Sequence, residues 1–192
     1  MKTIINLFIF LSITLQVYAQ SIPTLNAEDG DLKLSSLKID VQVVGNIATT
    51  TYDMLFYNST DRILEGQLSF PLGQNQNVTR FALAINNKLR EAVVVEKELG
   101  RVVFETTVRQ NIDPALLEKT KGNNYKARIY PIEPNSTKRV VLAYEQQLIY
   151  SKNAHQYLLP LDFKDKLDVF SCKIEVFNQL LEPIIKTRFL KM

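Results

Sequence analysis

Apolar and polar residues alternate with a period of two through most of this 192-residue chain. Successive side chains of a β-strand point to opposite faces, so each alternating segment predicts a strand with one apolar and one polar face. The alternating apolar positions are Leu37, Ile39, Val41 and Val43; Ala48, Thr50, Tyr52, Met54 and Phe56; Phe81, Leu83 and Ile85; Val140, Leu142, Tyr144, Leu148 and Tyr150; and Phe170, Cys172, Ile174 and Val176.

Turn-forming residues separate these segments, as at Gly45-Asn46 and Asn58-Ser59, and Asn86-Asn87 predicts a hairpin turn. Strands spaced by roughly 10–15 residues and separated by turns are typical of a β-sandwich. Two segments break the pattern. Apolar positions between Val95 and Gln110 recur at helical spacing, and Asp113-Pro114 predicts a short helix that runs through Leu116 and Leu117. We therefore expect a mainly β fold, an antiparallel β-sandwich with one or two short helical excursions.

The N-terminus has the pattern of a cleaved export signal. Lys2 precedes an apolar run from Ile4 to Leu15, and Val17 and Ala19 are small residues at the positions that a signal peptidase recognises. The run is shorter than the roughly 20 apolar residues of a membrane-spanning helix. We expect cleavage between Ala19 and Gln20, and no transmembrane segment in the remainder.

Composition limits the function classes. The formal net charge is only +3 and falls further when Lys2 is removed, and no cluster of basic residues compensates, so we expect no nucleic-acid partner. Cys172 is the single cysteine, which excludes an internal disulfide framework in an exported chain.

No grouping of residues predicts a catalytic, cofactor or metal site. His155 is the only histidine, and we expect it in a loop, with Cys172 buried in an inward-facing stripe where a thiolate is disfavoured. Asp162, Asp165 and Asp168 are interleaved with lysines and lack the glycine of a calcium loop. Glu96 and Glu98 lie two residues apart and would not share a helix face. We expect a non-catalytic protein without a cofactor or bound metal.

Three Asn-x-Ser/Thr sequons lie at predicted turns, with acceptor residues Asn58, Asn77 and Asn135. They predict possible N-glycosylation sites, although the motif is short and its use depends on the host.

Seven short stretches stand out for their order and spacing along the chain: Phe70-Pro71-Leu72, Val78 to Ile85, Val95-Glu96-Lys97, Phe104-Glu105, Asp113 to Glu118, Arg128 to Pro134 and Leu142 to Leu148. Together they resemble the VIT domain, the module of vault-associated proteins and inter-alpha-trypsin inhibitor heavy chains. The resemblance spans about residues 34–150, and it departs from the family at Gly73, Gly100 and Phe104, where a second proline, alanine and tyrosine are usual.

The resemblance implies a β-sandwich with helical excursions and an extracellular or scaffolding role, typically beside a von Willebrand factor A domain. That neighbour carries an Asp-x-Ser-x-Ser metal site, and no Asp-x-Ser occurs in this chain. We divide the chain into a signal peptide (1–19), a lead-in (20–33), a VIT-like sandwich (34–150) and the start of a second, truncated β-region (151–192).

These observations favour an exported interaction or scaffolding module, part of a larger adhesion or matrix-associated protein that binds a protein or matrix partner. The expected location is secreted, or periplasmic or at the cell surface in a bacterium. Two alternatives remain: a small β-sandwich hydrolase that uses ungrouped carboxylates, and a surface structural subunit that binds its own kind. A panel of hydrolase substrates tests the first, and light scattering tests the second.

Overall fold

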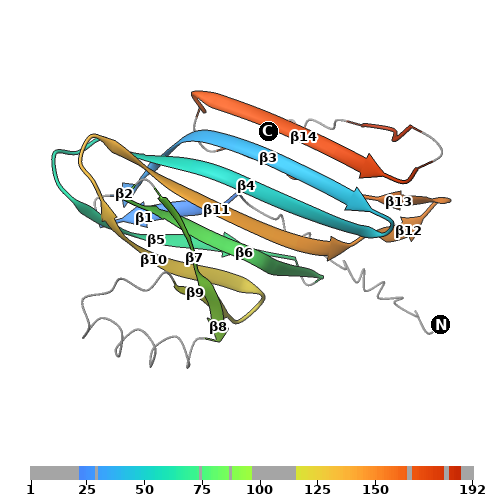
Figure 1. The fold of residues 1–192 in the computed structure, drawn as a ribbon, viewed down its shortest axis with the longest axis horizontal. Coiled ribbons are helices and arrows are strands. Elements are labelled where there is room, and N and C mark those ends of the chain that lie inside the picture. The colour runs from blue at the N-terminus through green and yellow to red at the C-terminus, as the bar shows by residue number, and fades with distance from the viewer. Residues whose placement is uncertain are drawn as a thin grey trace, which may run out of the picture.

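A computed structural model of the chain describes residues 22–28, 30–73, 75–86, 88–96, 116–163, 166–179 and 182–186. The described residues form fourteen strands and no helix (Figure 1). In chain order the strands are β1 (Thr24–Ala27), β2 (Gly30–Asp31), β3 (Lys33–Val44), β4 (Ile47–Asn58), β5 (Leu64–Pro71), β6 (Gln76–Ile85), β7 (Lys88–Glu91), β8 (Val93–Glu96), β9 (Leu116–Thr120), β10 (Asn124–Ile132), β11 (Ser136–Gln147), β12 (Ile149–Ser151), β13 (Ala154–Gln156) and β14 (Val169–Phe177).

Two six-stranded sheets make up most of the fold. Sheet A has the order β2-β1-β5-β10-β9-β8, sheet B has the order β14-β3-β4-β11-β6-β7, and β12 and β13 form a separate hairpin. Neighbouring strands are antiparallel except for β8 beside β9 and β14 beside β3. The mainly β fold and its antiparallel sandwich are therefore as the sequence predicts, and β6 and β7 form the expected hairpin across Asn86.

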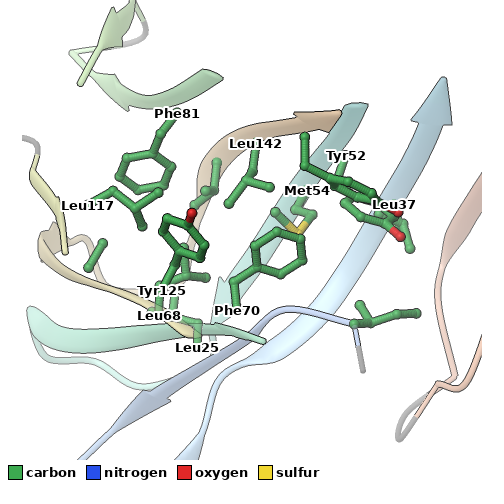
Figure 2. Packing of buried hydrophobic residues seen from close by; sticks show 14 of the residues in the cluster. Leu25, Leu37, Tyr52, Met54, Leu68, Phe70, Phe81, Leu117, Tyr125 and Leu142 are labelled. Carbon is green, nitrogen blue, oxygen red and sulfur yellow. The ribbon is translucent and has the colours of Figure 1, made fainter. Parts of the chain in front are cut away.

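The centre of sheet B follows the alternation in the sequence. Along β4 every second residue from Ala48 to Phe56 is buried, because these side chains face sheet A. Tyr52 lies opposite Ile39 of β3 on one side and opposite Leu142 of β11 on the other. Figure 2 shows Tyr52, Leu142 and Phe81 in the buried layer with residues of sheet A.

Aromatic rings join the two sheets. Phe70 of β5 in sheet A lies 6.0 Å, centroid to centroid, from both Tyr52 and Tyr144 of sheet B. The Tyr52 ring meets Phe70 nearly edge-on, at an interplanar angle of 82°. Such edge-to-face pairs stabilise by about 0.5–1.5 kcal/mol beyond the area that they bury. Phe70 also belongs to the Phe70-Pro71-Leu72 stretch, so this part of the family resemblance marks core packing.

The segment between β13 and β14 covers part of the inner face of sheet B. Tyr157, Leu159, Phe163 and Leu167 are partly buried against the core. The Tyr157 hydroxyl lies 2.7 Å from Thr50 Oγ1. Beyond this segment, β14 pairs in parallel with β3 along its whole length and so extends sheet B by one strand. The division of the chain near residue 151 stays a prediction.

The predicted short helix through Leu116 and Leu117 is wrong, because both residues lie in β9. Val95 and Glu96, which began the other predicted helix, lie in β8, and residues 97–115 lie outside the described residues. β8 and β9 pair in parallel, with Val95 opposite Glu118. Leu117 is fully buried, so pairing and burial in the sheet outweigh the local capping signal of Asp113-Pro114.

The predicted strand Val169 to Phe177 is confirmed, but the burial expected for its apolar stripe is wrong. Phe170, Cys172 and Ile174 are exposed, and only Val176 of that stripe is partly buried. These residues lie opposite buried residues of β3 and so share the inner face, but β14 is the outermost strand of sheet B.

Tyr150 also departs from the prediction. It was expected on the inner face of a long strand that continued from Val140, but it lies in β12 and its side chain is 62% exposed. The strand β11 ends at Gln147, and the chain then turns into the hairpin of β12 and β13.

Candidate interaction surface

Five exposed apolar side chains lie at one end of sheet B, and we call them the apolar end. Val44 is 54% exposed and lies opposite Ile47 across the β3–β4 hairpin and opposite Phe177 of β14. The register therefore places these three side chains in one row on the outer face. Gly45, which has a φ of +60°, makes the tight turn between Val44 and Ile47 possible.

The hairpin of β12 and β13 adds two more apolar residues to this end. Ile149 is 67% exposed and Tyr150 is 62% exposed. The backbone N–H of Leu148 donates to the carbonyl of Asn46 at 2.7 Å, which holds the hairpin beside the β3–β4 turn. In Figure 1, β12 and β13 lie next to the ends of β3 and β14. The apolar end thus consists of Val44, Ile47, Ile149, Tyr150 and Phe177.

The tip of this hairpin is ordered by local contacts. The rings of Tyr150 and His155 meet at 5.2 Å between centroids, and the Tyr150 hydroxyl donates to Oδ1 of Asn153 at 2.8 Å. Lys152 and Asn153 both have positive φ values, as turn residues do. The hairpin therefore presents Tyr150 in a defined position while most of its side chain stays accessible.

The rest of the outer face of sheet B carries charges that pair with one another. Arg139 donates to Asp53 through two hydrogen bonds, Nε to Oδ1 at 2.9 Å and Nη2 to Oδ2 at 2.7 Å. Arg80 donates to Glu91 from Nε and from Nη2, both to Oε1 at 3.1 and 2.7 Å, and holds the pKa of that carboxyl below its usual value. A bidentate pair such as Arg139 with Asp53 orients both side chains. The apolar end is therefore distinct in chemistry from the face that it adjoins.

Cys172 and His155, the single thiol and the single imidazole of the sequence, do not come together as a site in this fold. His155 is in β13, not in a loop as predicted, and its ring contacts Tyr150. Cys172 lies in a different sheet, on the exposed edge strand β14. Partial burial and the nearby Asp40 carboxylate raise the pKa of the Cys172 thiol, which disfavours the thiolate.

The described residues contain no cluster of three or more His, Cys, Asp or Glu residues with the geometry to hold a metal ion. Asp168, one of the three spaced aspartates, forms an ion pair with Lys33 at 2.9 Å. Asp162 is exposed, and Asp165 lies outside the described residues. The absence of a bound metal or cofactor therefore stays a prediction from the sequence.

The three sequon asparagines have different environments. Asn77 and Asn135 are exposed. Asn58 is fully buried, and its Nδ2 donates to the backbone carbonyls of Arg62, Ile132 and Glu133 at 2.9, 3.1 and 3.1 Å. The amide nitrogen to which a glycan would be attached is thus enclosed in the folded domain only at Asn58.

The predicted signal peptide and its cleavage site between Ala19 and Gln20 lie outside the described residues. None of the described segments forms a helix with the length and apolar character that crossing a bilayer requires.

The geometry defines a class of protein, a two-sheet β-sandwich module with an exposed apolar end. Residues 34–144 match the vault protein inter-alpha-trypsin domain, and this range is more than half of the chain. The chain therefore belongs to the VIT domain family, as its motifs predict, and this supports a non-catalytic module. No curated protein matches the chain. The matched range starts in β3 and ends in β11, so β12, β13, the covering segment and β14 all follow it.

The sequence reasoning did not identify the apolar end. Its five residues come from four strands that only the fold brings together, and the sequence pattern places Tyr150 in the apolar stripe of the strand that starts at Val140. One local signal was available. Two consecutive apolar residues stand on each side of the Gly45-Asn46 turn, Val43-Val44 before it and Ile47-Ala48 after it. One residue of each pair must therefore lie on the outer face.

Proposed function

We propose that this chain is an exported, non-catalytic interaction and scaffolding module of VIT type, within a larger adhesion or matrix-associated protein. Its partner is a protein or an extracellular matrix component, and its location is secreted, or periplasmic or at the cell surface in a bacterial host. The observation that carries the proposal is the apolar end, formed by Val44, Ile47, Ile149, Tyr150 and Phe177.

The clustering of these residues supports an interaction role. Single exposed apolar side chains are common on soluble proteins, whereas contiguous apolar patches mark interaction sites. Val44, Ile47 and Phe177 are adjacent by register, and Ile149 and Tyr150 lie on the two faces of a hairpin that is tied to the same turn. Tyrosine is also enriched at binding interfaces, because its ring buries a large area at a small entropy cost.

Site-specific photo-crosslinking tests the proposal. A photoreactive phenylalanine analogue replaces Tyr150 in one variant and the exposed Lys88 of β7, at the opposite edge of sheet B, in the control. In the secreted protein we expect adducts of one defined mass from position 150 and none from position 88. Absence of adducts at position 150, or equal labelling at both positions, would contradict the proposal.

Export is tested separately by N-terminal sequencing of protein recovered outside the cell. The proposal expects the mature chain to begin at Gln20, because Val17 and Ala19 occupy the positions that signal peptidase recognises. A cytosolic protein that retains Met1 would contradict this location.

A further inference from the structure

β14 is the longest of the outermost strands of the two described sheets, and its outer side has no described partner. The other outermost strands are short, with two residues in β2 and four each in β7 and β8, whereas β14 has nine. No described strand pairs with its outer side. An unpaired edge presents a row of free N–H and C=O groups, which is a template for another strand.

β14 also lacks two of the features that usually protect an edge. It contains no proline, and its pairing with β3 runs from Val169 to Phe177 without a bulge. Protected edges often carry unpaired lysines or inward-pointing charges. The only lysine of β14, Lys173, is on the outer face and forms an ion pair with Glu175 at 2.8 Å. By contrast, β7 consists of Lys88, Leu89, Arg90 and Glu91.

The two faces of β14 differ in chemistry. The inner-face residues have even numbers and are apolar: Phe170, Cys172, Ile174 and Val176. Ile174 is 43% exposed, although its partner across the ladder, Val41, is fully buried. The outer-face residues Lys173 and Glu175 are charged and lie opposite Asp40 and Gln42 of β3.

We propose that two copies of this chain associate edge to edge through antiparallel β14 strands, with Ile174 on the twofold axis. The inference deepens the proposed function and rests on it, because it names a second copy as a partner of the interaction module. A twofold axis normal to the sheet keeps inner-face residues opposite inner-face residues. Only registers centred on a single residue satisfy this condition.

Charge complementarity selects the register. With Ile174 on the axis, Lys173 of each copy lies opposite Glu175 of the other, and Cys172 lies opposite Val176. Opposite charges directly across an antiparallel pair stabilise it, and like charges destabilise it. A register centred on Lys173 or on Glu175 would place like charges on the axis. A register centred on Cys172 would leave both charges opposite uncharged residues.

Cysteine substitutions in a Cys172→Ser background test this register. Opposed Cα atoms of an antiparallel pair are about 4.5–5.5 Å apart, which is within disulfide range. Ile174→Cys should therefore give a disulfide-linked dimer on mild oxidation. Val176→Cys is the matched control on the same face, and its two copies would lie four residues out of register, about 14 Å apart. Equal linkage of both variants, or none at position 174, would overturn the register.

Charge variants test the association itself, measured by light scattering over a range of concentrations with the full chain. Lys173→Glu and Glu175→Lys should each weaken self-association, by roughly tenfold in Kd, because like charges then meet twice across the axis. An equimolar mixture of the two variants should restore it, since each variant complements the other. A folding defect in either variant would not be rescued by mixing. Failure of the mixture to associate more tightly than either variant overturns the proposal.

The tests separate this inference from the proposed function. A chain that is monomeric at every concentration, yet still forms photo-crosslinked adducts from position 150, would refute the dimer and leave the interaction role standing. A disulfide between the Ile174→Cys variant and a different protein would show that β14 pairs with a strand of that protein, and this outcome also overturns the dimer.

Discussion

The hydroxyl of Tyr157 lies 2.7 Å from Thr50 Oγ1, and this contact joins two residues that are 107 positions apart in the sequence. Thr50 is fully buried in β4, inside the VIT-matched range, whereas Tyr157 follows that range. The Phe163 ring then meets the Phe170 ring of β14 at 5.3 Å. Residues beyond the matched range thus contribute to the packing of the matched sheet.

Truncation after Tyr150 tests this relationship. The shortened protein loses Tyr157, Phe163 and β14, which exposes part of the inner face of β3 and β4. Each large apolar side chain that loses its cover contributes about 1.5–3 kcal/mol, so we expect several kcal/mol of lost stability. Urea unfolding of the chain with and without residues 151–192 measures it. An unchanged midpoint would mean that the later residues form an independent region.

The core of sheet B is tested by a pair of variants on one strand. Leu142 is fully buried between Tyr52 and Phe81, whereas Gln147 near the end of β11 is exposed. Leu142→Ala should cost about 2–5 kcal/mol, and Gln147→Ala should cost less than about 0.5 kcal/mol. Denaturant titration of both variants provides the comparison. Equal losses would contradict the assignment of inner and outer faces.

Alkaline pH should destabilise the fold through its buried tyrosines. Burial is the main cause that raises the pKa of Tyr52 and of Tyr157 well above the ordinary value for tyrosine. In the unfolded chain both groups ionise near pH 10, while in the folded chain they stay protonated. Stability is therefore full below about pH 10 and falls above it, by up to about 1.4 kcal/mol per pH unit for each tyrosine.

Urea titrations between neutral pH and pH 11 measure this slope, and Tyr157→Phe should reduce it. If the folded protein showed phenolate absorbance from all of its tyrosines at pH 12 without unfolding, the burial of these hydroxyls would be contradicted.

Asn58 is predicted to be a structural residue rather than a glycan acceptor. Its Oδ1 accepts hydrogen bonds from the backbone N–H and the hydroxyl of Thr60, at 2.9 and 2.7 Å. Its Nδ2 donates to three backbone carbonyls. Asn58→Ala removes these buried hydrogen bonds and should cost about 1–3 kcal/mol or more. Asn77→Ala, at an exposed sequon, is the matched control and should cost less than about 0.5 kcal/mol.

In a eukaryotic secretory host, mass spectrometry of the folded product should find glycans only at Asn77 or Asn135. A glycan at Asn58 in folded protein would refute the enclosed position of its amide.

Alternation in the sequence predicts which face a residue occupies, but not whether an opposing layer covers that face. β4 follows its pattern because sheet A and the segment between β13 and β14 together cover its inner side. Phe170 and Ile174 carry the same pattern and share the same face, yet they are exposed because β14 lies at the edge of the sheet. The sequence pattern could not reveal this difference, since it depends on the extent of the other sheet.

The helix predicted at Leu116 and Leu117 failed for a related reason. The capping signal of Asp113-Pro114 is local, whereas the pairing of β9 with β8 and β10 is decided by residues elsewhere in the chain. The apolar end also depends on contacts between distant parts of the chain. Val44, Tyr150 and Phe177 are far apart in sequence, and they come to one end only through the register of sheet B and the neighbouring hairpin.

The claim that the apolar end binds a partner, rather than supporting the fold, is tested most directly by one combined variant: Val44→Thr and Ile149→Thr. In this variant and in the unaltered chain, the photoreactive residue is placed at Ile47, between the altered positions, and both proteins are compared for unfolding free energy and for adduct formation. The account predicts stability within about 0.5 kcal/mol per site, because these side chains are exposed, together with loss of the adduct. A variant that unfolds more readily, or one that still forms the adduct at full yield, would contradict the account.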